Sequence, residues 1–119
     1  MQSKFDQLSK KFDINSFNTN TPKYSTQIIN NINNQQELIA VNGGRYVGQV
    51  VNGLPEGKGI DYYNNGDRYE GDFRNDKQEG KGIYYYNNGN RMMGDYYNNK
   101  PIGKHVTLTR NGEVKINNY

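Results

Sequence analysis

The chain has 119 residues, 32% of them hydrophobic, and a mean hydropathy of −1.12, so it has room for one small domain with a shallow apolar core. It contains no cysteine and no run of about 20 apolar residues, which excludes disulfides, thiolate metal sites and a transmembrane segment. The formal net charge is only +3, and basic and acidic side chains are interleaved along most of the chain, so we expect no nucleic-acid partner.

Residues 1–36 form a polar leader that is rich in Asn, Gln, Ser and Lys. A segment of this composition is expected to be disordered alone, or to be ordered by a partner. Phe5, Leu8 and Phe12 recur at helical spacing, and the isoleucines of residues 28–32 could do the same. These groups are either an incidental apolar scatter or short helices that dock on a partner. We take Phe5, Leu8 and Phe12 as the candidate partner-binding residues of the leader.

The start of the chain lacks the apolar core of a secretion signal. We therefore expect a cytoplasmic protein. An amphipathic presequence for import into an organelle stays open as an alternative.

Residues 37–119 contain a block of 23 residues that recurs about three times, with partial units at both ends. The copies begin at Arg45, Arg68 and Arg91, and each closes on an Asn-Gly pair. A period of this size is typical of stacked arrays, in which each unit buries its apolar surface against its neighbours. We therefore predict one repeat domain over residues 37–119.

Within each copy the residues alternate between two faces with a period of two, which predicts β-strands. Residues 52–56 carry Gly and Pro and are expected to form the loop of the first copy. The pair at residues 65–66, Asn-Gly, is typical of a tight turn into the next copy. The predicted fold class is all-β: a single-layer, twisted antiparallel β-meander of hairpin repeats, opened by residues 38–41, with a mostly irregular or short-helical leader.

Glycines at fixed places in each copy are expected to shape this sheet. A ring can lie flat over a strand residue that has no side chain, which offsets the cost of glycine in a strand. Pairing the strands about the loop centre places Gly80 across from Phe73, with equivalent pairs in the other copies. The predicted structural glycines are Gly48, Gly57, Gly59, Gly71, Gly80, Gly82, Gly94 and Gly103.

Glycines on one face would let the sheet curl toward that face into a trough. The rings of that face would then line a groove that could receive a partner's helix or strand. The candidate partner-binding residues of this groove are Tyr46, Tyr63, Tyr69, Phe73, Tyr86, Met92 and Tyr96. The opposite face is expected to be closed by Ile39, Ile60, Tyr62, Ile83, Tyr85, Val106 and Leu108.

The sequence contains no recognisable catalytic or cofactor-binding motif. Residues 53–59 look superficially like a phosphate loop, but the spacing is one residue short, Ser or Thr is missing, and no helix is predicted to follow. His105 is the only histidine, so a zinc site would need unusual ligands, and an acid–base role would need a partner and a pocket. We expect no catalytic residue, no metal, no cofactor and no enzymatic activity.

The second copy resembles the MORN repeat (membrane occupation and recognition nexus). Residues 69–73 read Tyr-Glu-Gly-Asp-Phe, residues 79–82 read Glu-Gly-Lys-Gly, and residues 88–89 read Asn-Gly. The family pattern is Tyr-Glu-Gly, an aromatic residue two positions later, and Gly-x-Gly further on. The resemblance covers residues 43–119.

The first and third copies depart from this pattern. Val47 and Met93 stand where the pattern has Glu, Met92 stands for Tyr, and His105 stands for the second Gly. We interpret the departures as worn or capping repeats.

The resemblance implies a curved β-meander that serves as a non-catalytic scaffold or protein-interaction module in a multi-subunit assembly, in the cilium, the axoneme or the cortical cytoskeleton. One alternative is a peripheral phospholipid-binding module, with weak anionic-lipid contact through the Arg and Lys that recur in every copy. Another is the targeting segment of a larger lipid kinase or methyltransferase. We favour the scaffold, because the basic residues have acidic neighbours.

Overall fold

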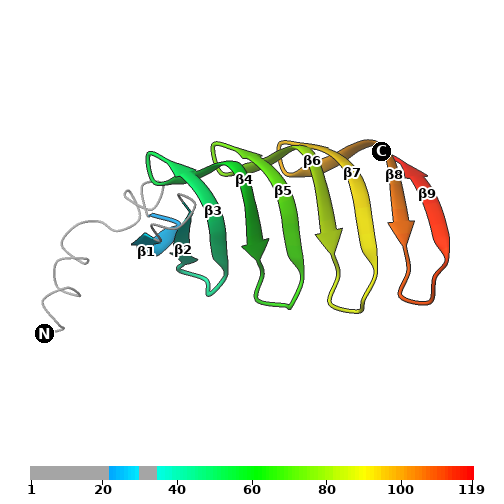
Figure 1. Ribbon diagram of the computed structural model, residues 1–119, viewed down its shortest axis with the longest axis horizontal. Helices are drawn as coiled ribbons and strands as arrows, with labels where there is room; N and C mark the ends of the chain where they lie inside the picture. The colour runs from blue at the N-terminus through cyan, green and yellow to red at the C-terminus, as the bar shows by residue number, and fades with distance from the viewer. Residues whose placement is uncertain (1–21, 30–34) are drawn as a thin grey trace, which may run out of the picture.

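The computed structural model describes residues 22–29 and 35–119, and these form one sheet of nine antiparallel strands (Figure 1). Strands that are neighbours in the sheet are consecutive in the chain. The strands are β1 (Tyr24–Ile29), β2 (Gln36–Ala40), β3 (Arg45–Val51), β4 (Leu54–Tyr62), β5 (Arg68–Arg74), β6 (Lys77–Tyr85), β7 (Arg91–Tyr97), β8 (Lys100–Leu108) and β9 (Val114–Asn118). Within the described residues there is no helix, hence none long enough to cross a membrane. The predicted all-β, single-layer meander is confirmed.

The sheet begins one strand earlier than predicted. β1 pairs with β2, and Ile28 lies opposite Glu37. The helical pattern expected for Ile28 and Ile29 is therefore wrong. β-branched side chains favour an extended backbone, and the edge of β2 carries backbone groups that another strand can satisfy. The boundary predicted at residue 37 falls inside the sheet.

The tips of the hairpins are shorter than predicted. They consist of two residues each, Asn52-Gly53, Asn75-Asp76 and Asn98-Asn99, and all six have positive φ, for example 50° at Asn75 and 66° at Asp76. Positive φ at both central residues is the geometry of a type I′ turn, which matches the twist of the flanking strands. Asn and Asp tolerate this conformation, so two residues suffice for each turn. Residues 54–56 therefore belong to β4 and not to a loop.

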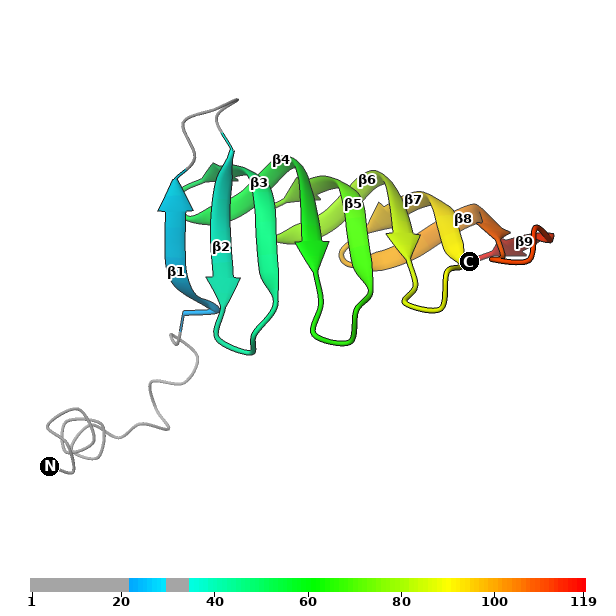
Figure 2. The same cartoon turned by 60° about the horizontal axis from the view of Figure 1, so that its bottom comes forward.

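The opposite ends of the strands meet in turns that line one long edge of the sheet (Figure 2). In three of these turns an Asn side chain accepts a hydrogen bond from the backbone N–H two residues later, as Asn65 does from Asp67 at 2.9 Å. Successive turns are also joined, because Asn64 donates to the carbonyl of Asn42 and Asn87 to that of Asn65. Much of the Asn content of the repeats therefore has a structural role along this edge.

A β-bulge in each hairpin changes the pairing predicted for the glycines. The register shifts within β5, so Phe73 pairs with Gln78 in its own hairpin and with Gly57 in the preceding one. The prediction that Gly80 faces Phe73 is wrong, and Gly80 instead pairs with Tyr96. The same shift recurs in the other two hairpins. A bulge adds residues to one strand, so counting outward from the loop centre cannot give the register on both sides of it.

Five glycines stand side by side in one column that crosses β3 to β7. The column is Gly48, Gly59, Gly71, Gly82 and Gly94. It has no room for side chains: a Cβ on Gly59 would lie 2.1 Å from Tyr46 Oη, and one on Gly82 would lie 2.3 Å from Tyr69 Oη. The other three predicted structural glycines, at the bulges, have positive φ. The tyrosine rings therefore lie over the glycine column.

The rings of this face, here called the ring face, pack edge to face in one continuous line. The line is Tyr46, Phe73, Tyr69, Tyr96, His105 and Tyr119, with centroids of neighbouring rings 5.0 to 5.3 Å apart. The hydroxyls of Tyr46 and Tyr69 donate to the carbonyls of Gln49 (2.7 Å) and Asp72 (3.3 Å). Edge-to-face ring pairs contribute roughly 0.5–1.5 kcal/mol beyond their buried area. This aromatic ladder is the core of the sheet.

In the third copy two departures from the repeat pattern compensate each other. Where the first two copies place Tyr over Gly, the third places Met92 beside His105, and the imidazole fills the space of the missing phenol. His105 Nε2 lies 2.7 Å from the carbonyl oxygen of Asp95, which is at the position of Gln49 and Asp72 in the other copies. Because a carbonyl only accepts, Nε2 donates this bond, as the tyrosine hydroxyl does elsewhere.

This exchange predicts a strong coupling between the two positions. His105→Gly should open a cavity and lower the free energy of unfolding by about 2–4 kcal/mol. Met92→Tyr alone should clash with the imidazole and cost about 1–3 kcal/mol. The double variant rebuilds Tyr over Gly and should recover most of both losses, as measured by thermal and urea unfolding of all four proteins. Losses that simply add in the double variant would contradict the exchange.

Candidate interaction surfaces

The structure buries most of the residues predicted to line a partner groove on the ring face. Tyr46 and Tyr69 are 0% exposed, and Phe73, Met92 and Tyr96 are also buried. These five side chains are not available to a partner, because the rings lie down on glycine and on one another and fill the trough themselves. They are core residues of the sheet and do not line an open groove.

The remaining predicted partner-binding residues are placed differently. Tyr63 is half-buried and Tyr86 is exposed, and both stand at the margin of the aromatic ladder with Tyr84 between them. Phe5, Leu8 and Phe12 of the leader lie outside the described residues. Their role stays a prediction.

A contact across the ring face shows how strongly the sheet curls. Tyr24 Oη donates to Asp76 Oδ1 at 2.7 Å, and Lys23 Nζ lies 3.1 Å from Asp76 Oδ2. Tyr24 is on β1, whereas Asp76 is in the tip between β5 and β6. In a flat sheet these strands would be about 19 Å apart, at roughly 4.8 Å per strand. The curl brings the start of the sheet onto the second hairpin tip.

Asp61 lies beneath this contact, in a polar hollow of about 510 Å³ that Lys23, Tyr63, Asp76 and Gln78 also line. Gln78 Nε2 donates to Tyr63 Oη at 2.8 Å. Burial, with repulsion from Asp76, raises the pKa of Asp61 to about 6, against opposing contributions from Lys23 and from a hydrogen bond with Tyr63. The hollow thus holds one carboxyl group that is only weakly stabilised as an anion.

The opposite face, here called the Val47 face, carries an apolar stripe that crosses the whole repeat domain. Successive members lie opposite one another in adjacent strands: Val47, Ile60, Glu70, Ile83, Met93, Val106 and Ile116. Part of the stripe is hollowed into a groove of about 640 Å³, lined by Val47, Ile60, Ile83 and Met93, with Lys58 and Lys81 beside them. The residues expected to close this face do lie on it and are half-buried, whereas their neighbours in the stripe, Met93 and Ile116, are 36% and 58% exposed. The face is open.

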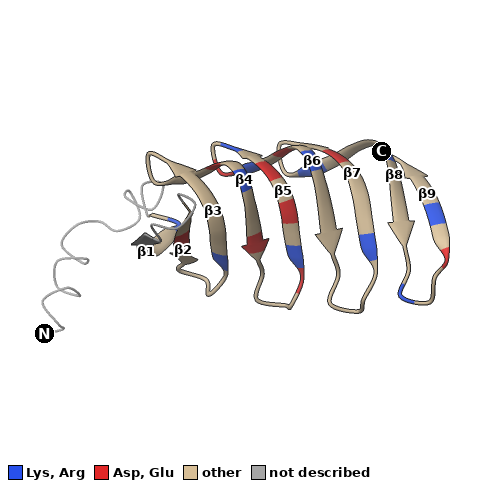
Figure 3. Cartoon of the chain, viewed as in Figure 1, with Lys and Arg blue, Asp and Glu red and all other residues tan. Residues whose placement is uncertain are grey.

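One flank of the stripe alternates arginine with apolar side chains. Its members in strand order are Arg45, Tyr62, Arg68, Tyr85, Arg91 and Leu108. The guanidinium of Arg45 lies 4.2 Å from the centre of the Tyr62 ring, and that of Arg68 lies 3.8 Å from the Tyr85 ring. Cation–π contacts of this kind hold the arginines in place on the surface. Figure 3 shows these arginines at the same height on β3, β5 and β7.

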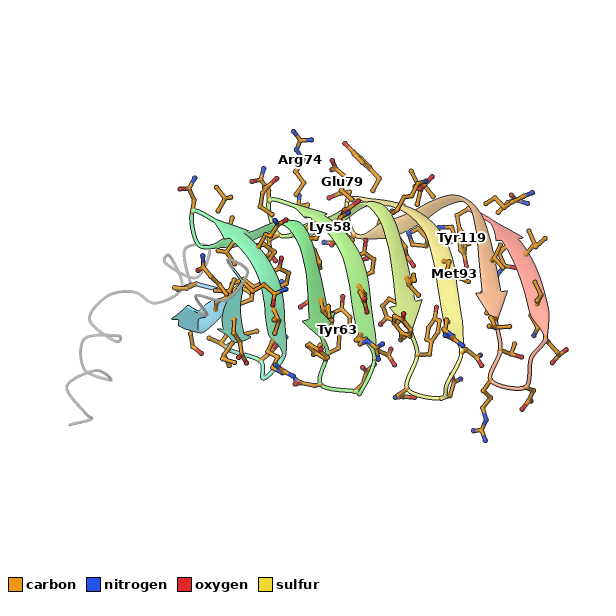
Figure 4. All side chains as sticks on the ribbon, in the orientation of Figure 1. Lys58, Tyr63, Arg74, Glu79, Met93 and Tyr119 are labelled. Atoms are coloured by element: carbon orange, nitrogen blue, oxygen red, sulfur yellow. The ribbon has the colours of Figure 1, made fainter. Side chains whose placement is uncertain are left out.

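The other flank carries the recurring lysines, and two of them are paired. Lys58 Nζ lies 2.5 Å from Asp72, and Lys81 Nζ lies 3.1 Å from Asp95. Among the described residues Lys104 forms no ion pair, and it lies opposite Asn118. A further pair, Arg74 with Glu79 at 3.4 Å, lies in the β5–β6 hairpin, and both residues are labelled in Figure 4. Exposed pairs such as these contribute roughly 0–1 kcal/mol each.

Sequence reasoning placed Ile60, Ile83 and Val106 on this face, but it left Val47 and Met93 out of the stripe because it treated them only as departures from a motif. The signal was nevertheless present. Both residues occupy the position of Glu70 in their copies, and the residues that face them across the strands, Ile60 and Ile83, are apolar as well.

Asp61 predicts a defined pH dependence of stability. Its pKa in the folded chain, about 6, is above the ordinary value of 3.8, so the folded chain binds the proton more tightly than the unfolded chain between these values. The carboxyl therefore destabilises the fold above pH 6, and this cost disappears as the pH falls toward 4. Asp61→Asn should raise the free energy of unfolding at pH 7.5 by on the order of 1 kcal/mol, with little gain at pH 4.

The measurement is urea unfolding of both proteins across this pH range. Asp95→Asn, which removes an exposed carboxylate paired with Lys81, controls for the loss of one negative charge. A gain in Asp61→Asn that is the same at both pH values would refute the proposed cause.

The comparison with protein families agrees with these repeats. The model of the MORN repeat matches residues 46–68 and residues 69–91. No curated protein matches the chain. The matched segments begin at Tyr46 and Tyr69, the two tyrosines that lie over the glycine column. The chain therefore contains two MORN repeats, over residues 46–91.

Proposed function

We propose that this chain is a non-catalytic scaffold module that joins other proteins in a larger assembly. The observation that carries the proposal is the apolar groove of the Val47 face. Sheets with an apolar face normally bury it against a second layer. Among the described residues no second layer covers the Val47 face, since all nine strands belong to one sheet. A partner that covers the groove would complete the missing layer.

The elongated shape supports a role in assembly. The longest dimension of the structure is 56 Å, and the repeats stack along this axis (Figure 1). Each strand presents the same positions at the same height, so a partner lying along this axis meets one row of equivalent contacts. Exposed apolar residues that form a contiguous row are a recognised mark of interaction sites.

The chemistry of the described residues also favours binding over catalysis. His105 is fully buried and its Nε2 is engaged by the Asp95 carbonyl. Within the described ranges no group of three or more His, Asp or Glu could hold a metal ion. Asp61 is surrounded by tyrosine, lysine and glutamine side chains that hold the fold together.

A protein partner is favoured over an anionic membrane. Glu70 stands in the middle of the apolar stripe, where it would repel a negatively charged surface. The ciliary or cortical location that the resemblance implies is part of this proposal, and imaging of the tagged chain in its own cells tests it.

Charged substitutions in the groove are predicted to abolish assembly, whereas the same charge outside the groove is predicted to leave it intact. In cells that naturally express the chain, the tagged protein should elute from a sizing column in a complex well above its own mass. The double variant Val47→Glu and Met93→Glu should shift to the monomer position, because two carboxylates replace the apolar floor. Val51→Glu, which puts the same charge on an exposed valine outside the groove, is the matched control and should stay in the complex. A wild-type chain that elutes as a monomer would contradict the proposal.

A further inference from the structure

We infer that the groove of the Val47 face receives an amphipathic α-helix whose apolar ridge is bordered by acidic side chains on both sides. The inference rests on the proposed function and names the chemistry of the partner. It follows from the spacing of the stripe, from the charges beside it and from the place of Glu70 within it.

The spacing of the stripe suits a helix laid across the strands. Its members repeat once per strand, at about 4.8 Å, whereas an α-helix repeats a side-chain row once per turn, at about 5.4 Å. From Val47 on β3 to Val106 on β8 the stripe crosses five strand spacings, or about 24 Å. A helix of roughly 16 residues covers this length at 1.5 Å per residue. One apolar residue per turn would then meet one strand after another.

The borders of the stripe are basic on both sides. Arg45, Arg68 and Arg91 stand on the flank nearer the turns, and Lys58, Lys81 and Lys104 stand on the flank nearer the tips. Arg45, Arg68, Lys58 and Lys81 pair with Glu37, Glu70, Asp72 and Asp95, so among the described residues Arg91 and Lys104 are the members of this set without an ion pair, one on each flank. A helix with carboxylates on both sides of its ridge is complementary to this arrangement.

The basic side chains can be engaged at little cost. The rings beneath Arg45 and Arg68 already hold these two side chains, so little conformational freedom is lost when they bind a carboxylate. The lysine side chains of the Lys58–Asp72 and Lys81–Asp95 pairs are 80% and 86% exposed, and such pairs exchange partners easily. Lys58 and Met93, both marked in Figure 4, line the same groove.

Glu70 makes the site selective among helices. It lies between Ile60 and Ile83 in the stripe, and its ion pair with Arg68 is long, at 3.8 Å. A ridge that covered it with leucine would desolvate a carboxylate without a close partner, which is unfavourable. The partner helix should therefore carry a Lys, Arg or hydroxyl residue at the third turn of its ridge. Apolar residues belong at the other turns.

The repeats themselves provide a variant that separates binding from folding. Val47, Glu70 and Met93 are equivalent positions, and the fold accepts glutamate at the middle one. Val47→Glu and Met93→Glu place the same side chain in the same strand environment. The double variant should keep the melting temperature of the wild type within a few degrees, and still lose the apolar floor.

The experiment measures binding of fluorescent 18-residue helical peptides to the full chain by anisotropy. The first peptide has an apolar ridge, one Lys at the third turn and Glu on both borders. The second exchanges the border Glu for Lys, and the third replaces the ridge Lys by Leu. We expect the wild-type chain to bind the first peptide at least tenfold more tightly than either of the other two. We expect the Val47→Glu, Met93→Glu variant to bind the first peptide at least tenfold more weakly than the wild type does.

Charge exchange gives an independent check. In the Glu70→Lys variant the preference at the third turn should reverse, so that a peptide with Glu there binds more tightly than one with Lys. Equal binding of the acidic and basic peptides, or unchanged binding to the double glutamate variant, overturns the inference. Binding to vesicles of phosphatidylserine and phosphatidylcholine without binding to the first peptide also overturns it, in favour of a lipid surface.

The outcomes separate this inference from the function it rests on. If the cellular complex is lost in the double glutamate variant and the first peptide does not bind, the scaffold function stands and the helical partner is overturned. If the cellular complex survives in that variant, the groove is not the assembly site. Both the helical partner and the placement of the scaffold function in the groove are then overturned.

Discussion

The contact on which the rest of the structure depends is a tyrosine ring lying over a strand glycine. Tyr46 over Gly59 and Tyr69 over Gly82 leave no space for a Cβ, and the phenols are hydrogen-bonded to carbonyls of their own strands. This contact turns glycine, which weakens a strand, into the place where a large ring is buried. It lets a single layer enclose a core without a second sheet or a helix.

The same contact assigns different tasks to the two faces. On the ring face the rings touch edge to face from Tyr46 to Tyr119 and consume the apolar surface of the trough. On the Val47 face the smaller aliphatic side chains cannot cover themselves, and the groove stays open. The buried core and the open groove are thus placed on opposite faces by the period of two along each strand. A surface substitution on one face need not disturb the other.

Compensation between copies extends this logic. In the third copy Met92 replaces the tyrosine of the first strand and His105 replaces the glycine of the second, so the ring changes strand. The hydrogen bond to the Asp95 carbonyl is kept. Val47 and Met93 exchange a charged position for an apolar one without altering the backbone pattern, since all three copies have strands of the same length. The first exchange preserves the core, and the second makes the surface of the Val47 face more apolar. Departures from a repeat motif therefore carry different meanings on the two faces.

The sequence by itself determined the class of fold, the 23-residue period, the turns at Asn-Gly and the need for glycine at fixed places, because these follow from local backbone preferences and from spacing along the chain. Only the tertiary structure decided which face is buried and which stays open. Burial of Tyr46, Tyr69 and Phe73 depends on how tightly the sheet curls, and the register beyond each bulge depends on residues that belong to the neighbouring hairpin. The contact of Tyr24 with Asp76 is likewise set by strand order and curvature, which no local pattern encodes.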